Sequence, residues 1–395
     1  MTQNHLMNTY KPLAITFTHG SGARLYDTQG KEYLDALAGI AVCGLGHAHP
    51  AVTAAISDQA GKLLHTSNLY HTSPQSTLAD SLCELSGMEK VFFCNSGAEA
   101  NEAAIKLARL YGHQQSIDTP QIIVTEGSFH GRTMATLSAT GNRKIQAGFE
   151  PLVPGFLRVP YDDMNAIQTI ASNRNDVVAI LVEPITGEGG IRIPDTNYLN
   201  QLRQLCDNNN WLLMLDEIQT GMGRTGRWFA HQHNAIQPDV MTLAKGLGNG
   251  VPIGACLTSK KAADIFQPGN HGSTFGGNPL TTRAALAVID TMTQENLVER
   301  AEKTGQQIFQ QLQTNLQDIQ GVVAIRGKGL MIGIELNRPC ATLVTDALEQ
   351  GLLINVTADS VVRLLPPLII TDEEATQIAE ITSQLIIRFL DTEAS

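Results

Sequence analysis

The sequence is poor in several features that mark particular classes of protein. It has no uncharged apolar run approaching the roughly 18 residues that a membrane-spanning helix requires. Lys and Arg (27) are fewer than Asp and Glu (38), and the formal charge of −11 disfavours a nucleic-acid partner, which needs a basic surface. No basic segment followed by an apolar one occurs at the N-terminus. We therefore expect a soluble, cytoplasmic protein that binds neither nucleic acid nor membrane.

Cysteine pairs and metal-ligand clusters are also missing. No CxxC pair occurs, and six cysteines stand singly along the chain: Cys43, Cys83, Cys94, Cys206, Cys256 and Cys340. This pattern predicts reduced, mostly structural thiols rather than a disulfide scaffold. The histidine pairs His47/His49 and His231/His233 have no carboxylate or cysteine ligand close by in the sequence. We therefore expect no metal site.

Short apolar segments alternate with longer segments of helical pattern, which predicts an α/β fold with a mostly parallel central sheet covered by helices. A chain of 395 residues with 43% hydrophobic content can bury a large core. The expected strands are Val91–Cys94, Gln121–Thr125, Val178–Glu183, Trp211–Leu215, Val240–Ala244 and Ile253–Thr258. In the segment Ala98–Tyr111, Ala103, Leu107, Leu110 and Tyr111 fall on one face of a helix.

The pattern changes after Pro279, which predicts a second domain. A long helix-like run, Leu280–Asp318, is followed by short strands at Met331–Leu336 and Val361–Leu364, and by a final helix from about Asp372 to Leu390. We expect a large domain over residues 51–280 and a smaller α+β domain over residues 281–395. Residues 1–50 are expected to pack with the small domain.

Two charged residues directly follow strongly apolar strands. Asp216 ends the run Trp-Leu-Leu-Met-Leu, and Lys245 follows Val-Met-Thr-Leu-Ala. A buried carboxylate suits a protonated pyridine nitrogen, whose ring charge it maintains, and a desolvated lysine is a nucleophile able to form an imine. Ile218 would then pack on the ring face, and Gln219 would reach the phenolic oxygen of the ring. Singly, Asp216 is more often a cap and Lys245 a solvated residue, but together at successive strand ends they favour the chemical interpretation.

A small-residue loop, Cys94–Ala98, joins a strand to the start of a helix. Free amide groups at a helix N-terminus bind phosphate, and here Ser96 would add a hydroxyl, with Gly97 and Ala98 offering backbone N–H groups. An ordinary N-cap is the simpler interpretation of this loop alone. The segment His271–Thr274 contains further hydroxyls that would complete a phosphate cradle.

The segment Ser128–Thr133 combines an aromatic residue with an arginine after an expected strand. Phe129 would stack on a cofactor ring, and Arg132 would hold a carboxylate in a bidentate pair. Core packing for Phe129 and a surface ion pair for Arg132 are equally common alternatives.

One glycine motif is misleading. Gly221–Gly226 has the letters GxGxxG, but it starts too far beyond the strand and follows two carboxylates, Asp216 and Glu217, that would repel a pyrophosphate. No acidic residue at the end of a strand follows at the roughly 20-residue spacing of a dinucleotide site. A dinucleotide-dependent oxidoreductase is therefore a minor alternative, which NAD uptake without bound pyridoxal would support.

In combination, these segments resemble the successive motifs of the class III aminotransferases over almost the whole chain. The matching stretches are NSGAEANEAAIKLAR, SFHGRT, VEPITGEGG, LDEIQTGMGRTG, LAKGLGNG and HGSTFGGNP. The resemblance implies the fold of the fold-type I enzymes that bind pyridoxal 5′-phosphate at the interface of a homodimer.

The resemblance also implies a role for each matching residue. Lys245 would hold the cofactor as a Schiff base, and Asp216 would contact the pyridine nitrogen. The other cofactor contacts would be Ser96, Gly97, Ala98, Phe129, Ile218, Gln219 and, from the neighbouring subunit, Thr274.

Within that class, the chain is most similar to the acetylornithine aminotransferases, including the stretch LAGIAVCGLGHAHP. The implied reaction converts N-acetylornithine and 2-oxoglutarate to N-acetylglutamate semialdehyde and glutamate, in arginine biosynthesis. Arg132 would hold the carboxylate remote from the reacting carbon, and Arg363 would hold the α-carboxylate of the keto acid. Glu188 would neutralise Arg363 while the amino donor is bound. The substrate side of the site is assigned to Arg132, Arg363, Ser273 and Glu188.

The acyl group of the substrate is less determined. Ornithine δ-aminotransferases carry a tyrosine where this chain has Gly39-Ile40, which removes a hydroxyl able to hold a free α-amino group. An acylated substrate is therefore favoured over ornithine, with succinylornithine and other ω-amino acids as alternatives. A catalytically idle relative that keeps only the fold is disfavoured by the joint presence of Lys245, Asp216 and Arg132.

Overall fold

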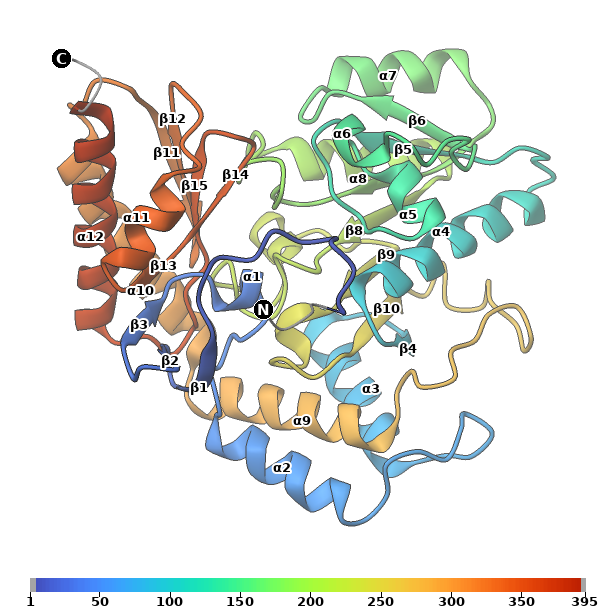
Figure 1. Cartoon of the computed structure of the whole chain (residues 1–395). Coiled ribbons are helices and arrows are strands. Elements are labelled where there is room, and N and C mark those ends of the chain that lie inside the picture. The colour runs from blue at the N-terminus through green and yellow to red at the C-terminus, as the bar shows by residue number, and fades with distance from the viewer. Residues whose placement is uncertain (1–4, 392–395) are drawn as a thin grey trace.

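The structure of the protein is a computed structural model that describes residues 5–391. Within that range the strands form one sheet of seven strands and two sheets of four (Figure 1). No helix between residues 5 and 391 is long and apolar enough to cross a membrane. Within the same range all six cysteines are free.

The seven-stranded sheet forms the centre of the molecule and has the order β4-β10-β9-β8-β7-β5-β6. Its strands are β4 (Lys90–Cys94), β5 (Gln121–Thr125), β6 (Phe156–Val159), β7 (Val177–Val182), β8 (Leu212–Asp216), β9 (Val240–Leu243) and β10 (Gly254–Thr258). Neighbours from β6 to β9 are parallel, whereas β10 is antiparallel to β4 and to β9. The expected α/β fold with a mostly parallel central sheet is confirmed.

Helices cover both faces of this sheet because its strands are apolar on both sides. On β8, Leu212 packs in one core with Leu107 of α4, whereas Leu213 packs in another with Leu202 of α8. The helices up to residue 209 are α1 (Ala38–Ala41), α2 (Pro50–Ala60), α3 (Ser73–Ser86), α4 (Gly97–Gln114), α5 (Met134–Ala139), α6 (Arg143–Gln146), α7 (Met164–Asn173) and α8 (Tyr198–Asn209).

In the central sheet the sequence pattern missed one strand, and in the run Leu280–Asp318 it missed a helix break. β6, at the sheet edge, was not expected, because its sequence Phe-Leu-Arg-Val is only four residues long and Arg158 interrupts its apolar run. The run Leu280–Asp318 forms two helices, α9 (Pro279–Gln294) and α10 (Leu297–Leu316). Asn296 between them has φ 53°, a left-handed conformation that asparagine tolerates and that ends the first helix.

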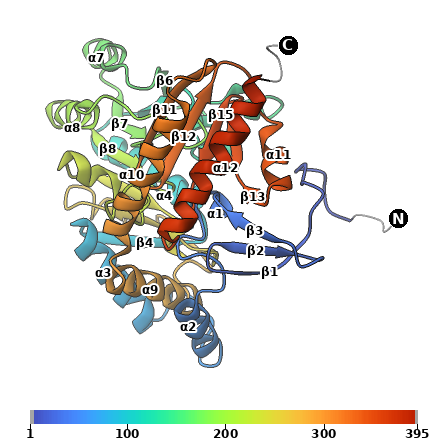
Figure 2. The ribbon, with the colours of Figure 1, turned by 90° about the vertical axis from the view of Figure 1, so that its left-hand side faces the viewer.

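The C-terminal part contains an antiparallel sheet backed by helices. The sheet has the order β11-β12-β15-β14, and the elements of this part are β11 (Val322–Lys328), β12 (Met331–Leu336), α11 (Leu343–Glu349), β14 (Asn355–Thr357), β15 (Val361–Leu364) and α12 (Asp372–Asp391). Figure 2 shows α10 and α12 lying side by side against this sheet.

The N-terminal strands join the same part of the molecule. They are β1 (Phe17–Ser21), β2 (Arg24–Asp27) and β3 (Glu32–Asp35), and β3 pairs in parallel with β13 (Leu352–Leu353). We propose on this basis the division into an N-terminal segment (1–50), a large domain (51–280) and a small domain (281–395). At the second boundary, α9 packs against α2 and α3 of the large domain (Figure 1).

Candidate active site

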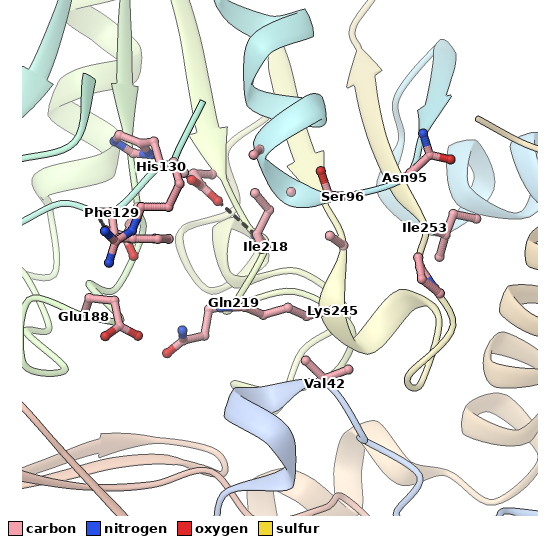
Figure 3. Close-up of a pocket in the computed structure, with 18 of the residues that line it drawn as sticks. Val42, Asn95, Ser96, Phe129, His130, Glu188, Ile218, Gln219, Lys245 and Ile253 are labelled. Atoms are coloured by element: carbon pink, nitrogen blue, oxygen red, sulfur yellow. Dashed lines mark hydrogen bonds and ion pairs between the residues drawn. The ribbon is translucent and has the colours of Figure 1, made fainter. Parts of the chain in front are cut away.

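A cavity of about 390 Å³ lies at the carboxyl ends of the parallel strands, where open α/β sheets place their ligands. In Figure 3, Phe129 and Glu188 line one side of it and Ser96 the other, with Lys245 between them. The remaining lining residues are Val42, Asn95, Gly97, Ala98, His130, Gly131, Arg132, Glu183, Asp216, Ile218, Gln219, Ala244 and Gly250–Ile253. Ten of the sequence-predicted site residues therefore share one cavity.

Asp216 is a buried carboxylate with three hydrogen-bond donors around it. Asn101 Nδ2 donates to Oδ2 at 2.7 Å, His130 Nδ1 lies 2.8 Å from the same oxygen, and the Ile218 N–H donates to Oδ1 at 3.1 Å. The side chain is only 3% exposed. These three donors hold the buried carboxylate in one orientation.

Sequence reasoning missed two of these partners. Asn101 is a fully buried polar residue on α4, where it also accepts a hydrogen bond from Thr242 Oγ1 at 2.8 Å. His130 is buried, and its Nε2 has no hydrogen-bond partner within residues 5–391. The available signals were an asparagine one helical turn before the apolar Ile105 and a histidine inside SFHGRT.

Lys245 follows β9 in a strained conformation beside the cavity. Its φ is 44°, in the left-handed region that costs a non-glycine residue about 1 kcal/mol. Burial lowers the pKa of the Lys245 ammonium, and the positive charge of Arg363 lowers it further. An amine with a lowered pKa is more often neutral and therefore nucleophilic at physiological pH.

The N-terminus of α4 faces the same cavity. Ser96 is its N-cap, because Ser96 Oγ accepts the Glu99 N–H at 3.2 Å. The serine therefore has the capping role that was the simpler interpretation of this loop, and it also lines the cavity. The N–H groups of Gly97 and Ala98 lie in the first helical turn, where no intrahelical acceptor exists. Gly97 is also required sterically, because a Cβ there would lie 2.7 Å from Ile218 Cδ1.

A second acid, Glu183, connects two walls of the cavity and was not singled out from the sequence. Its carboxylate accepts the N–H of Phe129 and the N–H of Gly187, each at 2.9 Å. Burial, reinforced by the negative charge of Asp216, raises the pKa of Glu183 to about 7. Glu183 thereby holds Phe129 and the loop that carries Glu188 in register.

Arg363 and Glu188 form an ion pair beside the cavity. Arg363 Nη1 lies 2.7 Å from Glu188 Oε1; the arginine is fully buried, whereas the glutamate side chain is 37% exposed. Arg363 also donates to Asn355 Oδ1 at 3.0 Å and to Gln219 Oε1 at 3.4 Å. Because only the glutamate reaches solvent, it is the partner that can move away when another carboxylate arrives.

Three of the predicted site residues do not lie inside the cavity: one is at its mouth and two lie outside it. Arg132 is exposed at the cavity mouth, with its guanidinium carbon 5.7 Å from the centre of the Phe129 ring. Ser273 and Thr274 do not line the cavity. Ser273 Oγ accepts hydrogen bonds from Asn95 Nδ2 and the Gly276 N–H, both at 3.1 Å, and exposed Thr274 lines a different hollow, with His65–Asn68.

The remaining motifs are structural. His47 Nε2 lies 2.8 Å from Asp35 Oδ2, which, with a weaker contribution from Cys43, raises the pKa of His47 to about 9. His231 Nδ1 pairs with Glu217 at 2.9 Å. In residues 5–391 no three His, Cys, Asp or Glu side chains gather as metal ligands. In the Gly221–Gly226 loop, buried Arg224 donates to the carbonyl groups of Leu330 and Pro366.

The arrangement fits pyridoxal phosphate. The amine of Lys245, the buried carboxylate of Asp216 and the helix N-terminus at Gly97 face one cavity, which matches an aldehyde, a ring nitrogen and a phosphate. Phe129 and Ile218 both line this cavity and offer apolar contact to the faces of a ring. The site is also large enough, since a cofactor-sized pocket typically measures a few hundred Å³.

Comparisons with known proteins agree with one another. The family model described as aminotransferase class-III matches residues 6–386. The acetylornithine aminotransferase of Nitrosomonas europaea is 59% identical over 98% of this chain and 99% of its own length, and acetylornithine aminotransferase 1 of Bordetella bronchiseptica is 55% identical over 98% of each.

Solved structures are similar over nearly the full chain. The ornithine aminotransferase of Toxoplasma gondii has a TM-score of 0.95 at 34% identity, covering 98% of this chain and 94% of its own. A second structure of that enzyme is described with partial occupancy of PLP at its active site. The N-acetylornithine aminotransferase of Stenotrophomonas maltophilia has a TM-score of 0.84 at 37% identity, covering 97% of this chain and 98% of its own.

Proposed function

The chain belongs to the class-III aminotransferases, and from that membership we propose the reaction and the roles of its residues. It is a pyridoxal-phosphate-dependent aminotransferase that moves the δ-amino group of N2-acetyl-L-ornithine to 2-oxoglutarate. The products are N-acetyl-L-glutamate 5-semialdehyde and L-glutamate, a step of arginine biosynthesis. The observation that carries this proposal is the Arg363–Glu188 ion pair at 2.7 Å beside the Lys245 amine.

The ion pair suits a site that takes two unlike substrates in turn. Acetylornithine presents an uncharged methylene next to its reacting carbon, so Glu188 stays on Arg363 and neutralises it. 2-Oxoglutarate presents a carboxylate at the same place, and this carboxylate replaces Glu188 on the buried guanidinium. Arg132, at the cavity mouth, holds the carboxylate at the far end of either substrate.

Lys245 and Asp216 carry the proton chemistry. Pyridoxal phosphate, when bound, supplies an electron-withdrawing ring that stabilises negative charge on the substrate carbon. Lys245 takes the proton from that carbon and returns one during the transfer, for which its lowered pKa is suited. Asp216 keeps a proton on the ring nitrogen, and Asn101 and His130 orient its carboxylate.

Two features support an acylated amino donor. The full-length relatives at 59% and 55% identity are acetylornithine aminotransferases. Near the cavity, Ala38–Ala41 forms a left-handed turn that includes Gly39 and Ile40 and leads to the wall residue Val42. Gly39 and Ile40 bring no hydroxyl that would bind the free α-amino group of ornithine. Succinylornithine remains the second candidate, because its acyl group also blocks that amine.

Assembly as a homodimer with shared active sites belongs to the same proposal. Thr274 is exposed and lies outside the cavity of its own subunit, next to Phe275, whose side chain is 60% exposed. A second copy would cover this apolar residue and bring Thr274 to the partner's phosphate site. We place the enzyme in the cytoplasm, where its six free cysteines stay reduced.

A comparison of amino donors tests the substrate. We expect kcat/KM with 2-oxoglutarate to be highest for acetylornithine and at least about tenfold lower for ornithine, because burying an unpaired α-ammonium costs about 1.4 kcal/mol or more. Steady-state kinetics with acetylornithine, succinylornithine, ornithine and 4-aminobutyrate measure this order. A preference for ornithine or 4-aminobutyrate would refute the acetylornithine assignment.

The gate is tested by Glu188→Ala. We expect the half-reaction with acetylornithine to slow by about tenfold or more. The buried guanidinium of Arg363 then has no carboxylate partner and lies against an uncharged methylene of the substrate. The half-reaction with 2-oxoglutarate should change by less than about threefold, since its own carboxylate pairs with Arg363. Stopped-flow measurement of each half-reaction separates the two, and Glu188→Gln, which keeps the size, serves as control. Equal losses in both half-reactions would contradict the gate.

A further inference from the structure

Four successive residues beside the active-site cavity have left-handed backbone conformations. In the turn Ala38–Ala41 the φ angles are 51°, 64°, 66° and 60°. Only one of these residues is a glycine, and residues with a Cβ normally adopt this conformation singly rather than in a run. The turn leads to Val42, which lines the cavity (Figure 3). Contacts outside the turn must therefore hold it in place.

Asp35, the last residue of β3, makes the first of these contacts. Its Oδ1 accepts the N–H groups of Leu37 at 2.9 Å and of Ala38 at 2.8 Å. Its Oδ2 lies 2.8 Å from Nε2 of His47. The Asp35 side chain is only 3% exposed, so these contacts are formed away from water, where they are strong. Asp35 therefore fixes the backbone at the point where the left-handed turn begins.

His47 lies beyond the other end of the turn and is held by the N-terminal strands. Its backbone exchanges two hydrogen bonds with Gly22, and a Cβ on Gly20 of β1 would lie only 2.6 Å from the His47 Cβ. The hydrogen bond to Asp35, with a weaker contribution from Cys43, raises the pKa of His47 to about 9, so the imidazole is protonated at neutral pH. The ion pair thus ties the start of the turn to a firmly packed residue.

The segment between Val42 and His47 has a second, independent anchor on the loop that follows Lys245. Asn249 Oδ1 accepts the N–H of Leu45 at 2.8 Å, and Asn249 Nδ2 donates to the carbonyl group of Gly46 at 3.1 Å. These bonds do not involve the ion pair. Loss of the pair should therefore loosen the turn and leave the lysine loop in place.

We propose that Asp35 and His47 are positioning residues for the choice of amino donor: their ion pair holds the left-handed turn, and with it Val42, in the position that excludes a free α-amino group. The proposal rests on the transaminase function above and deepens it, because it assigns the preference for an acylated donor to two residues outside the cavity lining. When the pair is broken, the turn relaxes and water reaches the apolar wall, where it can solvate the ammonium group of ornithine.

Three variants of the holoenzyme test the pair. His47→Ala removes the partner of Asp35. Asp35→Asn removes the charge but keeps the size and an oxygen for the two N–H groups, whereas His47→Gln keeps a group that can donate to Asp35. We measure kcat and KM for acetylornithine and ornithine, the half-reaction with 2-oxoglutarate by stopped flow, and the melting temperature.

His231→Ala is the matched control. His231 is also buried and pairs with a carboxylate, that of Glu217, at 2.9 Å, but neither residue lines the cavity. We expect this variant to lower the melting temperature and to leave the ratio of kcat/KM for acetylornithine to kcat/KM for ornithine unchanged. A purely structural role of His47 would predict the same behaviour for His47→Ala.

We expect His47→Ala instead to lower this ratio by about fivefold or more, mainly through KM. Asp35→Asn should act in the same direction, and His47→Gln should keep most of the wild-type ratio. The half-reaction with 2-oxoglutarate should change by less than about twofold in all three variants, because Arg363 and Arg132 bind the keto acid.

A glycine in the turn provides an independent check. Ala38→Gly removes the Cβ that makes a φ of 51° unfavourable, so the turn needs less support. Added to His47→Ala, it should recover about half or more of the lost ratio. Asp35→Asn decides the question if His47→Ala does not fold.

The outcomes separate this inference from the proposed function. An unchanged ratio in Asp35→Asn and His47→Ala, an equal fall in His231→Ala, or no recovery with Ala38→Gly would overturn the positioning role. A wild-type enzyme that does not prefer acetylornithine to ornithine would overturn the proposed donor, on which the inference rests.

Discussion

The Lys245→Ala variant is expected to lose transamination, with kcat at least about 10³-fold below that of the wild type. Lys245 is the lysine that lines the cavity, and burial lowers the pKa of its ammonium so that the neutral amine can accept a proton. Alanine has no group that could replace it. Alanine pays the same cost as lysine at φ 44°, so the fold should be retained.

Two measurements check this result. Steady-state kinetics give kcat, and borohydride reduction followed by mass spectrometry shows whether the cofactor becomes attached to the chain. Wild-type protein should gain the mass of the reduced cofactor, and Lys245→Ala should not. Lys260→Ala, an exposed lysine outside the cavity, is the matched control and should keep both properties. Attachment and unchanged turnover in Lys245→Ala would refute the assignment.

Asp216→Asn is expected to lower kcat by roughly 10²- to 10³-fold while leaving the shape of the site nearly unchanged. The amide fills the same volume but carries no negative charge, so the ring nitrogen loses the partner that keeps it protonated. The effect should be large because Asp216 is only 3% exposed, and water cannot replace its charge. Titration of the cofactor absorbance with pH should show easier loss of that proton in the variant.

Asp239→Asn separates chemistry from stability. Asp239 is also a buried acid beside the central sheet, where Oδ2 accepts from Arg203 and from the Leu213 N–H at 2.8 and 2.9 Å. It does not line the cavity. We expect Asp239→Asn to lower the melting temperature without a comparable loss in kcat. Similar losses of kcat in both variants would mean that Asp216 acts only through the fold.

Much of the fold and of the site could be predicted because the relevant signals are local. A strand buried on both faces has a continuous apolar sequence, and the first polar residue after it marks the start of the next loop. Asp216 and Lys245 stood out for this reason, and both lie at the cavity. Expected strand ends differ from the observed ones by at most one residue in β8 and β9.

Other parts depended on signals that the chain does not carry locally. β6 has only four residues, and Arg158 interrupts its apolar run, whereas the break between α9 and α10 rests on the conformation of Asn296. Glu183 looked like the last residue of a strand, but its carboxylate accepts the N–H of Gly187 in the loop that follows and the N–H of Phe129, 54 residues away. Hydrogen bonds between loops leave no periodic pattern.

The sequence by itself determined the α/β class, the motifs of the family and the two charged residues at adjacent strand ends, because burial of strands and caps of helices are set by near neighbours. Only the tertiary structure decided which side chains share a cavity, that Glu188 reaches Arg363, and that Asn101 and His130 both reach Asp216. The physical reason is that charge interactions depend on distance in space, and strand order brings together residues that the sequence keeps far apart.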